Sequence, residues 1–374
     1  MSVVTADVIV IGLGAMGGAA FRSLASRGLR VVGIEQHSVP HALGSSHGET
    51  RIIRKAYFEH PDYVPLLRRS YELWGDLETA IGQQLYHETG LLLIGPPDGE
   101  AIPGARLAAE RHGIAIEPLS AADLRRRFPW ITPREGDECL FEPEAGFLEV
   151  ERCVEAQVRD GERRQGTAAC GERVVEWSAE GRVARVVTDR GRYEAGALVI
   201  AGGPWASRLL HEMHVPLEVV RKPVVWFRSR PGAVAPTCGF FVEQEGRAFY
   251  GVPSLERGMT KLAEHTGGNV VEDADRVDRL LRSEDVGPLQ TFAETTLRDI
   301  DSTPVRSAVC LYTLTPDRHF VIDQHPGHAN VAVACGFSGH GFKFAPVVGE
   351  ALADLAVRGE SALPIGFLQN RSWT

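Results

Sequence analysis

Three glycines at a fixed spacing carry the clearest chemical signal in the sequence. Gly12, Gly14 and Gly17 form a G-x-G-x-x-G pattern directly after the apolar run at 7–11. The first glycine allows a tight turn, the second lets the backbone approach a pyrophosphate, and the third permits close helix–strand packing. Glu35, about 20 residues further on, can accept hydrogen bonds from both ribose hydroxyls. The pattern predicts a dinucleotide site and disfavours NADP, because Glu35 would repel a 2′-phosphate, but it does not separate FAD from NAD.

Several other side chains could do chemistry, but each is ambiguous when taken alone. Arg51 and Arg54, after the loop SSHGET, could hold an anionic substrate or tune a cofactor, although arginines are mostly exposed. Cys310 could be a nucleophile or a covalent attachment point, or a small buried strand residue. Lys343 lies in a glycine-rich loop and could pair with a carboxylate or simply be solvated. The same ambiguity applies to His47, Tyr250, Lys261 and His265.

Hydrophobic periodicity predicts the elements that must position these residues. Nearly continuous apolar runs, typical of strands buried on both faces of a parallel sheet, occur at 7–11, 197–201 and 331–334. Further strands are predicted at 30–35, 91–94, 173–176, 183–188 and within 215–250. Helices are predicted from Gly17 to about Arg27 and at 61–81, 272–282 and 347–358, with exposed helices at 106–111 and 121–127.

The order of these elements predicts an α/β protein that is α+β overall. Buried parallel strands lie near the start, middle and end of the chain, whereas the segments between them have an antiparallel pattern. We expect a Rossmann-like dinucleotide-binding domain built from discontinuous segments, 1–88, 146–214 and 320–374. A mainly antiparallel β substrate domain is expected to be inserted as 89–145 and 215–319.

Composition excludes several classes of protein. The chain of 374 residues is 44% hydrophobic and 24% charged, as in ordinary globular proteins, and its net charge of −9 argues against a nucleic-acid partner. No apolar run reaches the roughly 18 residues that would predict a membrane span. The six cysteines form no CxxC pair, so we expect no metal site. No basic segment precedes the first apolar stretch, so we expect a cytoplasmic protein with free thiols.

Taken together, these segments resemble a known family, namely monomeric sarcosine oxidase and its relative N-methyltryptophan oxidase, within the amino-acid-oxidase-like flavoproteins. The matching segments are DVIVIGLGAMG, SSHGETRIIR, YELW, FEPEAG, ALVIAGGPWASRLL, YGVPS, KLAEHT, SAVCLYT and CGFSGHGFKFAPVVGE. They follow the family's order and cover nearly the whole chain. GFSGHGFK and VCLYT are the most specific to this branch.

The resemblance implies a cofactor and a role for each ambiguous residue. The dinucleotide is then FAD, and Cys310 matches the cysteine that carries the flavin through a thioether at its 8α-methyl group. Arg54 and Lys343 match the two cations that hold the substrate carboxylate. Lys261 matches the lysine that activates oxygen. The remaining matches are His47 and Arg51 beside the flavin ring, Tyr250 and His265 in the substrate pocket, and Gly339, Gly341 and Lys343 in the cofactor loop.

The implied reaction is the oxidation of a secondary amine in an amino acid. A sarcosine-like N-methyl amino acid, oxygen and water would give the demethylated amino acid, formaldehyde and hydrogen peroxide. The expected partners are therefore a small-molecule amino acid and oxygen, and the expected state is a monomer.

Two departures from the family pattern leave the amine open. Phe241 stands where sarcosine-specific members carry a methionine, and Glu264 stands where an uncharged, often aromatic residue is expected. Oxidation of N-methyltryptophan or of a proline-like or pipecolate-like imino acid is thus an alternative. An NAD-dependent dehydrogenase would explain residues 7–35 but not GFSGHGFK or VCLYT. A non-catalytic nucleotide-sensing or interaction protein would make Arg54 and Lys343 incidental.

Overall fold

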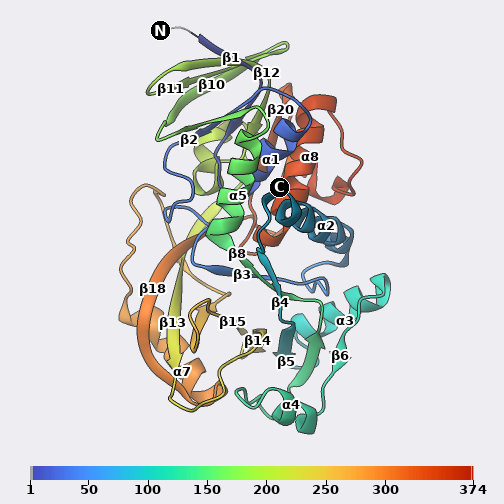
Figure 1. Cartoon of the computed structure of the whole chain (residues 1–374), viewed down its shortest axis with the longest axis vertical. Helices are drawn as coiled ribbons and strands as arrows, with labels where there is room; N and C mark the ends of the chain where they lie inside the picture. Colours follow the sequence, from blue (N-terminus) through green and yellow to red (C-terminus); the bar gives the residue numbers. More distant parts are fainter. Residues whose placement is uncertain (1–2, 372, 374) are drawn as a thin grey trace.

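A computed structural model describes residues 3–371 and 373. The described residues form an eight-stranded, a nine-stranded and a three-stranded sheet. Figure 1 shows the eight-stranded sheet in the upper half of the molecule, the nine-stranded sheet in the lower half, and the small sheet between them. The prediction of an α/β protein with an added antiparallel β region is confirmed.

The eight-stranded sheet is parallel at its centre. It contains β1 (Val3–Ile11), β2 (Val31–Glu35), β9 (Gly166–Cys170), β10 (Val174–Glu180), β11 (Val183–Thr188), β12 (Arg192–Ile200), β19 (Val321–His325) and β20 (His328–Cys335). β1 pairs in parallel with β2 and β12, and β12 pairs in parallel with β20. The three apolar runs predicted as buried strands therefore lie side by side, although they are far apart in the sequence.

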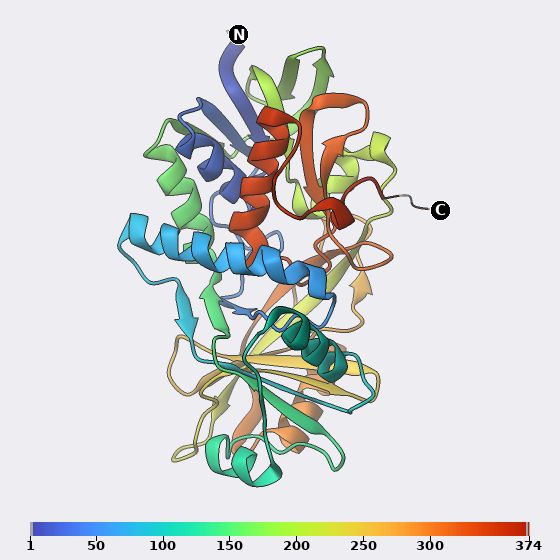
Figure 2. The same ribbon diagram turned by 90° about the vertical axis from the view of Figure 1, so that its right-hand side faces the viewer.

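Helices cover this sheet and cross one another closely. The helices of the upper half are α1 (Ala15–Ser26), α2 (Val64–Ile81), α5 (Val150–Glu162), α6 (Ala206–Leu209) and α8 (Ala345–Arg358). Figure 2 shows α8 beside α1 and α2 running across their lower ends. A Cβ on Gly349 of α8 would lie 2.4 Å from the backbone carbon of Ala19, so the crossing of α1 and α8 requires glycine there. α8 ends at Gly359, which has φ +81° and caps the helix.

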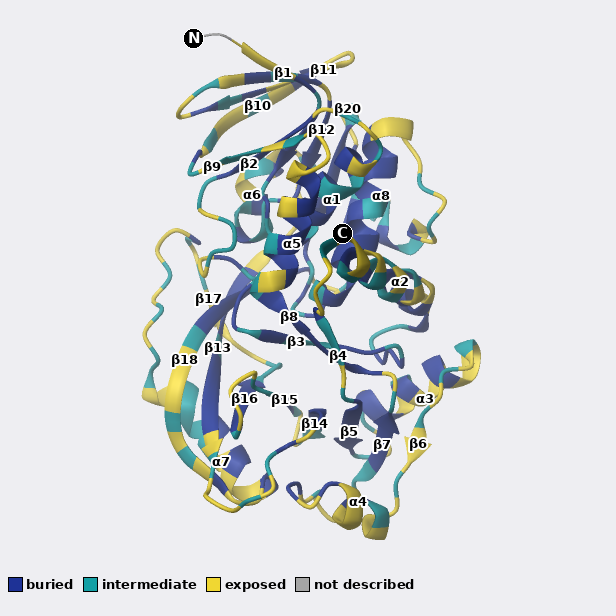
Figure 3. Cartoon of the chain, viewed as in Figure 1, coloured by how far each residue is buried: buried dark blue, intermediate teal, exposed yellow. Residues whose placement is uncertain are grey.

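The nine-stranded sheet forms the lower half and is mainly antiparallel. It contains β5 (Leu91–Gly95), β6 (Glu117–Pro118), β7 (Glu138–Glu142), β13 (Glu218–Ser229), β14 (Gly239–Gln244), β15 (Arg247–Pro253), β16 (Met259–Glu264), β17 (Asn269–Val270) and β18 (Ile300–Leu314). β13 and β18 form its longest ladder, in which Lys222 lies opposite Cys310. β13 is buried along most of its length, whereas the first half of β18 is largely exposed (Figure 3).

The remaining elements connect the two halves or cover the lower sheet. The small sheet consists of β3 (Thr50–Ile53), β4 (Tyr86–Glu88) and β8 (Gly146–Glu149). The lower helices are α3 (Ala101–His112), α4 (Ala121–Arg127) and α7 (Ser283–Thr296). The short 3-10 turns are Pro61–Tyr63, Gly203–Trp205, His211–Met213, Phe342–Phe344 and Gly366–Leu368. None of the helices in the described part of the chain is long and apolar enough to cross a membrane.

The predicted helix at 272–282 is wrong. This segment is irregular, runs along the left edge of the molecule in Figure 1, and precedes α7. The indole of Trp205 donates to Asp275 at 2.6 Å, and Arg279 donates to the carbonyl of Leu43 at 2.6 Å. The charged residues of this segment are spaced as on the surface of a helix, but no apolar stripe accompanies them that could pack a helix against the core. Their side chains bind other parts of the chain instead. The predicted exposed helix at 106–111 is part of α3, whose alanine face is buried.

Candidate active site

The glycine turn after β1 is as compact as its sequence predicts. Gly12 has φ +86°, and a Cβ there would lie 2.5 Å from the carbonyl oxygen of Ala201. A Cβ on Gly17 would lie 1.7 Å from the carbonyl oxygen of Gly12, so the helix can pack against the turn only without a side chain. Gly14 has only the Ser46 hydroxyl near its missing side chain, at 3.8 Å, and lines a cavity.

The carboxylate of Glu35 lies at the end of β2 against this turn. Its two oxygens accept the backbone N–H of Leu13 at 2.9 Å and of His37 at 3.0 Å. Burial raises the pKa of Glu35, and these two hydrogen bonds oppose that rise. Each oxygen keeps a lone pair that can accept a hydrogen bond from a ribose hydroxyl.

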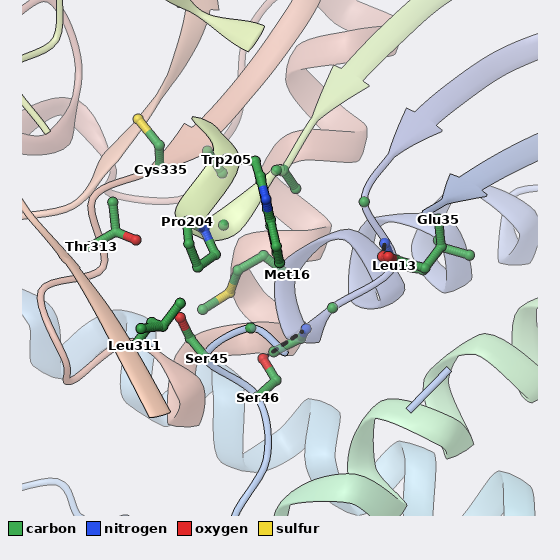
Figure 4. A pocket seen from close by; sticks show the side chains of 18 of the residues that line it. Leu13, Met16, Glu35, Ser45, Ser46, Pro204, Trp205, Leu311, Thr313 and Cys335 are labelled. Carbon is green, nitrogen blue, oxygen red and sulfur yellow. Dashed lines mark hydrogen bonds between the residues drawn. The ribbon is translucent and has the colours of Figure 1, made fainter. Parts of the chain in front are cut away.

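We refer to the elongated hollow at this turn as the larger cavity. Figure 4 shows Glu35 and Leu13 at one end, Leu311 and Thr313 at the other, and Met16, Pro204 and Trp205 between them. Gly339 and Gly341 also line it, whereas Lys343 of the same loop does not. The glycine turn, the N-terminus of α1 and the carboxylate of Glu35 fit the pyrophosphate and ribose of a dinucleotide such as FAD; among the described residues, the first N–H of α1 donates only to the Ser46 hydroxyl, at 3.3 Å.

Cys310 and His47 are buried beside Arg51, which is half-buried and lines this cavity. Cys310 Sγ lies 3.2 Å from Arg51 Nη2 and 3.9 Å from His47 Nδ1. Burial alone would raise the pKa of the thiol, but Arg51 and His47 outweigh it and lower the pKa to about 6. His47 Nε2 is buried without a hydrogen-bond partner among the described residues, so a bound group could supply one. The cluster can present a thiolate nucleophile.

Lys261 lies on β16, next to the same loop. Its side chain is fully buried, and Nζ donates to the carbonyl of Gly48 at 3.0 Å and to the carbonyl of Thr50. Burial, reinforced by Arg51, lowers the pKa of Lys261 well below its usual value. Lys261 lines neither of the two cavities in the described part of the chain.

Glu49 fixes the loop that holds Lys261. It has φ +72°, and its carboxylate accepts hydrogen bonds from Trp226 at 2.7 Å, Ser254 at 2.9 Å and Arg306 at 2.6 Å. These donors come from the lower sheet. The loop therefore ties the two halves together at the point where Lys261, Arg51 and Cys310 meet.

A second hollow, the smaller cavity, adjoins the larger one and shares Arg51, Tyr312, Gly339 and Phe342 with it. Four residues to which the resemblance assigns substrate contacts line the smaller cavity, namely Arg54, Tyr250, His265 and Lys343. They come from four separate segments of the chain. The fold thus brings these residues together beside the far end of the dinucleotide site.

Arg54 and Lys343 are buried cations on the same side of this cavity. Their side chains face one aromatic ring, that of Tyr57, with centroid distances of 4.4 Å for Arg54 Cζ and 5.2 Å for Lys343 Nζ. Lys343 Nζ also donates to the carbonyl of His340 at 2.7 Å. Burial and the nearby Arg54 lower the pKa of Lys343 to about 7. Such a pair of cations can bind a carboxylate.

Glu59 was not predicted from the sequence, and it competes with any anionic ligand for the hydrogen bonds that Arg54 donates. Arg54 Nη2 donates to both Glu59 oxygens, at 2.7 and 2.6 Å, and Glu59 lines the smaller cavity. Burial would raise the pKa of Glu59, but Arg54, His340 and Lys343 lower it to about 2. Tyr57 and His340 were also missed, and they are hydrogen-bonded to each other. No local sequence signal identifies these three residues, because nothing in the sequence around them shows that Tyr57 and Glu59 meet His340 and Lys343 beside one cavity.

Two further wall residues of the smaller cavity, His265 and Tyr250, are neutral. His265 lies between Phe241 and Tyr312, with ring-centroid distances of 5.9 and 5.8 Å. Burial lowers the pKa of His265 to about 3 and raises that of Tyr250, so both side chains are uncharged near neutral pH. Within residues 3–371 and 373, no group of His, Cys, Asp and Glu is arranged to hold a metal ion.

The two departures from the family pattern differ in their consequences. Phe241 lines the smaller cavity and packs against Phe58, with a ring-centroid distance of 5.0 Å. Glu264 does not line it, because its carboxylate turns away and accepts a hydrogen bond from Arg247 at 2.9 Å. Only Phe241 therefore alters the shape of this cavity.

Comparisons with known proteins agree with this geometry. A family model described as FAD dependent oxidoreductase matches residues 7–355. The chain is 40% identical to monomeric sarcosine oxidase of Streptomyces avermitilis, over 98% of this chain and 97% of that protein. It is 32% identical to N-methyl-L-tryptophan oxidase of Salmonella dublin, over 96% of each. The solved structure of NikD, an unusual amino acid oxidase essential for nikkomycin biosynthesis, superposes with a TM-score of 0.88 at 26% identity, covering 99% of this chain and 98% of that one.

Proposed function

The chain belongs to the family of FAD-dependent amine oxidases that includes monomeric sarcosine oxidase and N-methyltryptophan oxidase, and from this premise we propose that it oxidises sarcosine or a similarly small N-methyl amino acid. The products are the demethylated amino acid, formaldehyde and hydrogen peroxide. One observation supports this proposal above all. Two buried cations, Arg54 and Lys343, line a small cavity that opens beside the far end of a dinucleotide site.

Arg54 and Lys343 hold the substrate carboxylate. The planar guanidinium suits a carboxylate, and the lysine adds a compact charge at its other side. Because Glu59 already accepts two hydrogen bonds from Arg54, Lys343 supplies the less encumbered of the two cations. Binding of the carboxylate orients the amine toward the larger cavity.

The size of the smaller cavity favours a small substrate. About 60 Å³ of it is open to the centre of a water-sized sphere. A sarcosine-sized molecule fits such a space, whereas an indole side chain would require Phe241, which packs against Phe58, to move.

The remaining steps are the acceptance of electrons, the exclusion of water and the reduction of oxygen, and each is assigned to a separate group. FAD, when bound, supplies the two-electron acceptor. The uncharged side chains of His265 and Tyr250 form walls that exclude water from the amine. Lys261 Nζ, held by the carbonyls of Gly48 and Thr50, would provide positive charge where oxygen is reduced when it is protonated.

Cys310 is the site of covalent attachment. A thiolate there would replace one hydrogen of the flavin 8α-methyl group, and forming this C–S bond would release two electrons and one proton. Together with the proton lost when the thiol ionises, these would convert oxygen to hydrogen peroxide. Its pKa of about 6 and its contact with Arg51 support this role. Residues 1–88, 146–214 and 320–374 then form the FAD-binding domain, and 89–145 and 215–319 the substrate domain. We place the enzyme in the cytoplasm as a monomer.

The test is a panel of amines read out by hydrogen peroxide and formaldehyde. The panel contains sarcosine, N-methyltryptophan, proline, pipecolate and glycine. We expect the highest kcat/KM with sarcosine or another small N-methyl amino acid. A yellow protein inert toward every member contradicts the proposal, as does a colourless protein that binds NADH.

A further inference from the structure

The distribution of lysines points to one residue that the proposed function leaves unused. The chain has only four lysines among its 40 lysine and arginine residues. Lys55 pairs with Glu144 near the surface, whereas Lys222, Lys261 and Lys343 are 4%, 0% and 6% exposed. Lys261 and Lys343 already have roles in the site. Since arginine supplies nearly all the other cations, a third buried lysine suggests a position that needs a compact ammonium with three donors.

Lys222 lies on β13, and its ammonium donates hydrogen bonds to three consecutive carbonyls in the turn that follows β16. Its Nζ donates to the carbonyls of His265 at 2.9 Å, Thr266 at 2.6 Å and Glu264 at 3.5 Å. The turn wraps around the lysine, because a Cβ on Gly268 would lie 3.2 Å from Lys222 Cε. A planar guanidinium has no such arrangement of three converging donors.

His265, which lines the smaller cavity, depends on this turn for its position. Its ring nitrogens have no hydrogen-bond partner in the described part of the chain, and the ring packs between Phe241 and Tyr312. Its backbone N–H donates to Ala248 at 2.7 Å, and its carbonyl accepts from Lys222. The direction of the ring is therefore set through the backbone.

Lys222 also touches the second aromatic wall of the cavity. Its ammonium lies 5.2 Å from the centroid of the Tyr312 ring, and Lys222 does not itself line the cavity. Burial lowers the pKa of Lys222 to about 8, opposed by Glu264 and reinforced by Arg318. A buried ammonium without a carboxylate in hydrogen-bond contact costs stability, which the three carbonyls offset.

We propose that Lys222 is a positioning residue, which fixes His265 and Tyr312 in the wall of the smaller cavity and so sets how the amine is presented for oxidation. The proposal rests on the proposed function, since it assigns a further residue to the same site. Lys222 itself touches no substrate.

The test compares Lys222→Met with Lys55→Met, the same substitution at the lysine near the surface. In Lys222→Met we expect anaerobic flavin reduction at saturating substrate to slow at least about tenfold, because misplacing a reacting group by about 1 Å costs up to about a hundredfold. Binding of propionate, followed by the flavin absorbance spectrum, should change less than about threefold, because Arg54 and Lys343 remain. Lys55→Met should match the unmodified protein in both measurements.

A double-mutant cycle separates positioning from general damage. Adding Lys222→Met to His265→Ala should slow reduction less than Lys222→Met does alone, because one of the two side chains that the lysine positions is already removed. Full additivity of the two substitutions, or an unchanged reduction rate in Lys222→Met, overturns the proposal. If Lys222→Met does not fold, Lys222→Gln, which keeps an amide donor, replaces it in the same cycle.

A readout that does not depend on turnover distinguishes failure of this proposal from failure of the proposed function. In protein labelled with ¹³C at histidine, the His265 ring resonance should shift in Lys222→Met and stay in place in Lys55→Met. An unmoved resonance contradicts the role of Lys222 even if the enzyme oxidises sarcosine. A shifted resonance in a protein that oxidises no amine would remove the proposed function and leave the structural coupling intact.

Discussion

The thiol of Cys310 contacts the guanidinium of Arg51, with 3.2 Å between Sγ and Nη2. Cys310 lies on β18 of the lower sheet, and Arg51 lies on β3 of the small sheet between the two halves. The contact therefore exists only when both halves are assembled. It lowers the pKa of a buried thiol that would otherwise stay protonated.

Cys310→Ala should abolish covalent flavin attachment without abolishing FAD binding. The yellow pigment should then stay in the supernatant after acid precipitation, whereas the unmodified protein should retain it in the pellet. Cys238→Ala is the matched control, because Cys238 is also buried but burial raises its thiol pKa to about 12. Pigment that remains in the Cys310→Ala pellet would show that the attachment point is elsewhere.

Lys343→Met should raise KM for carboxylate substrates by about tenfold or more, because a charge-assisted hydrogen bond contributes roughly 1.5–3 kcal/mol. The pKa of Lys343 in the free protein is lowered to about 7, so its charge is present below that pH and is lost above it. We expect kcat/KM to fall as the pH rises through this range, and the fall to be absent in Lys343→Met. A variant that keeps the same alkaline fall would remove Lys343 from the carboxylate site.

Lys261→Met should slow the reaction of the reduced enzyme with oxygen far more than the reduction of the flavin by substrate. The side chain lies by Arg51 and Cys310 and outside the smaller cavity, so its loss leaves substrate binding in place. Stopped-flow measurement of the two half-reactions separates these effects. Equal slowing of both would contradict a role confined to oxygen.

Phe241→Ala should widen the range of accepted amines. Removing the ring opens the wall that Phe241 forms with Phe58, so kcat/KM for N-methyl amino acids with larger side chains should rise relative to sarcosine. A change of about 10- to 200-fold in this ratio is typical when a hydrophobic pocket wall changes size. The ratio of the two kcat/KM values is the measurement, and an unchanged ratio would mean that Phe241 does not limit substrate size.

The local sequence was sufficient to predict the dinucleotide-binding turn, but it was not sufficient to predict which residues line the smaller cavity. The G-x-G-x-x-G pattern, the strand before it and Glu35 depend on neighbours within one βαβ unit, and the structure shows the predicted arrangement. Arg54, His265 and Lys343 each looked ambiguous, because what defines them is burial beside residues from distant segments. Only the resemblance to a family grouped them.

The wrong helix prediction and the missed cavity residues both result from contacts between segments that the local sequence does not show. The segment 272–282 carries charges at helical spacing, but Asp275 and Arg279 bind Trp205 and Leu43 across the chain, and these contacts override helix propensity. Glu59 and Tyr57 lie close to Arg54 in sequence, yet nothing local shows that the chain turns them into the same cavity. The scarcity of lysine was the one compositional signal that could have pointed to Lys222.

An anaerobic titration with sarcosine shows whether Arg54 and Lys343 present a small N-methyl amino acid to bound FAD. Sarcosine is added to the purified protein without oxygen, and the visible absorbance of the flavin is followed. We expect complete bleaching, with one formaldehyde formed per flavin, and one hydrogen peroxide per flavin once oxygen is admitted. A flavin that stays oxidised with sarcosine and with every other small N-methyl amino acid would rule out this function.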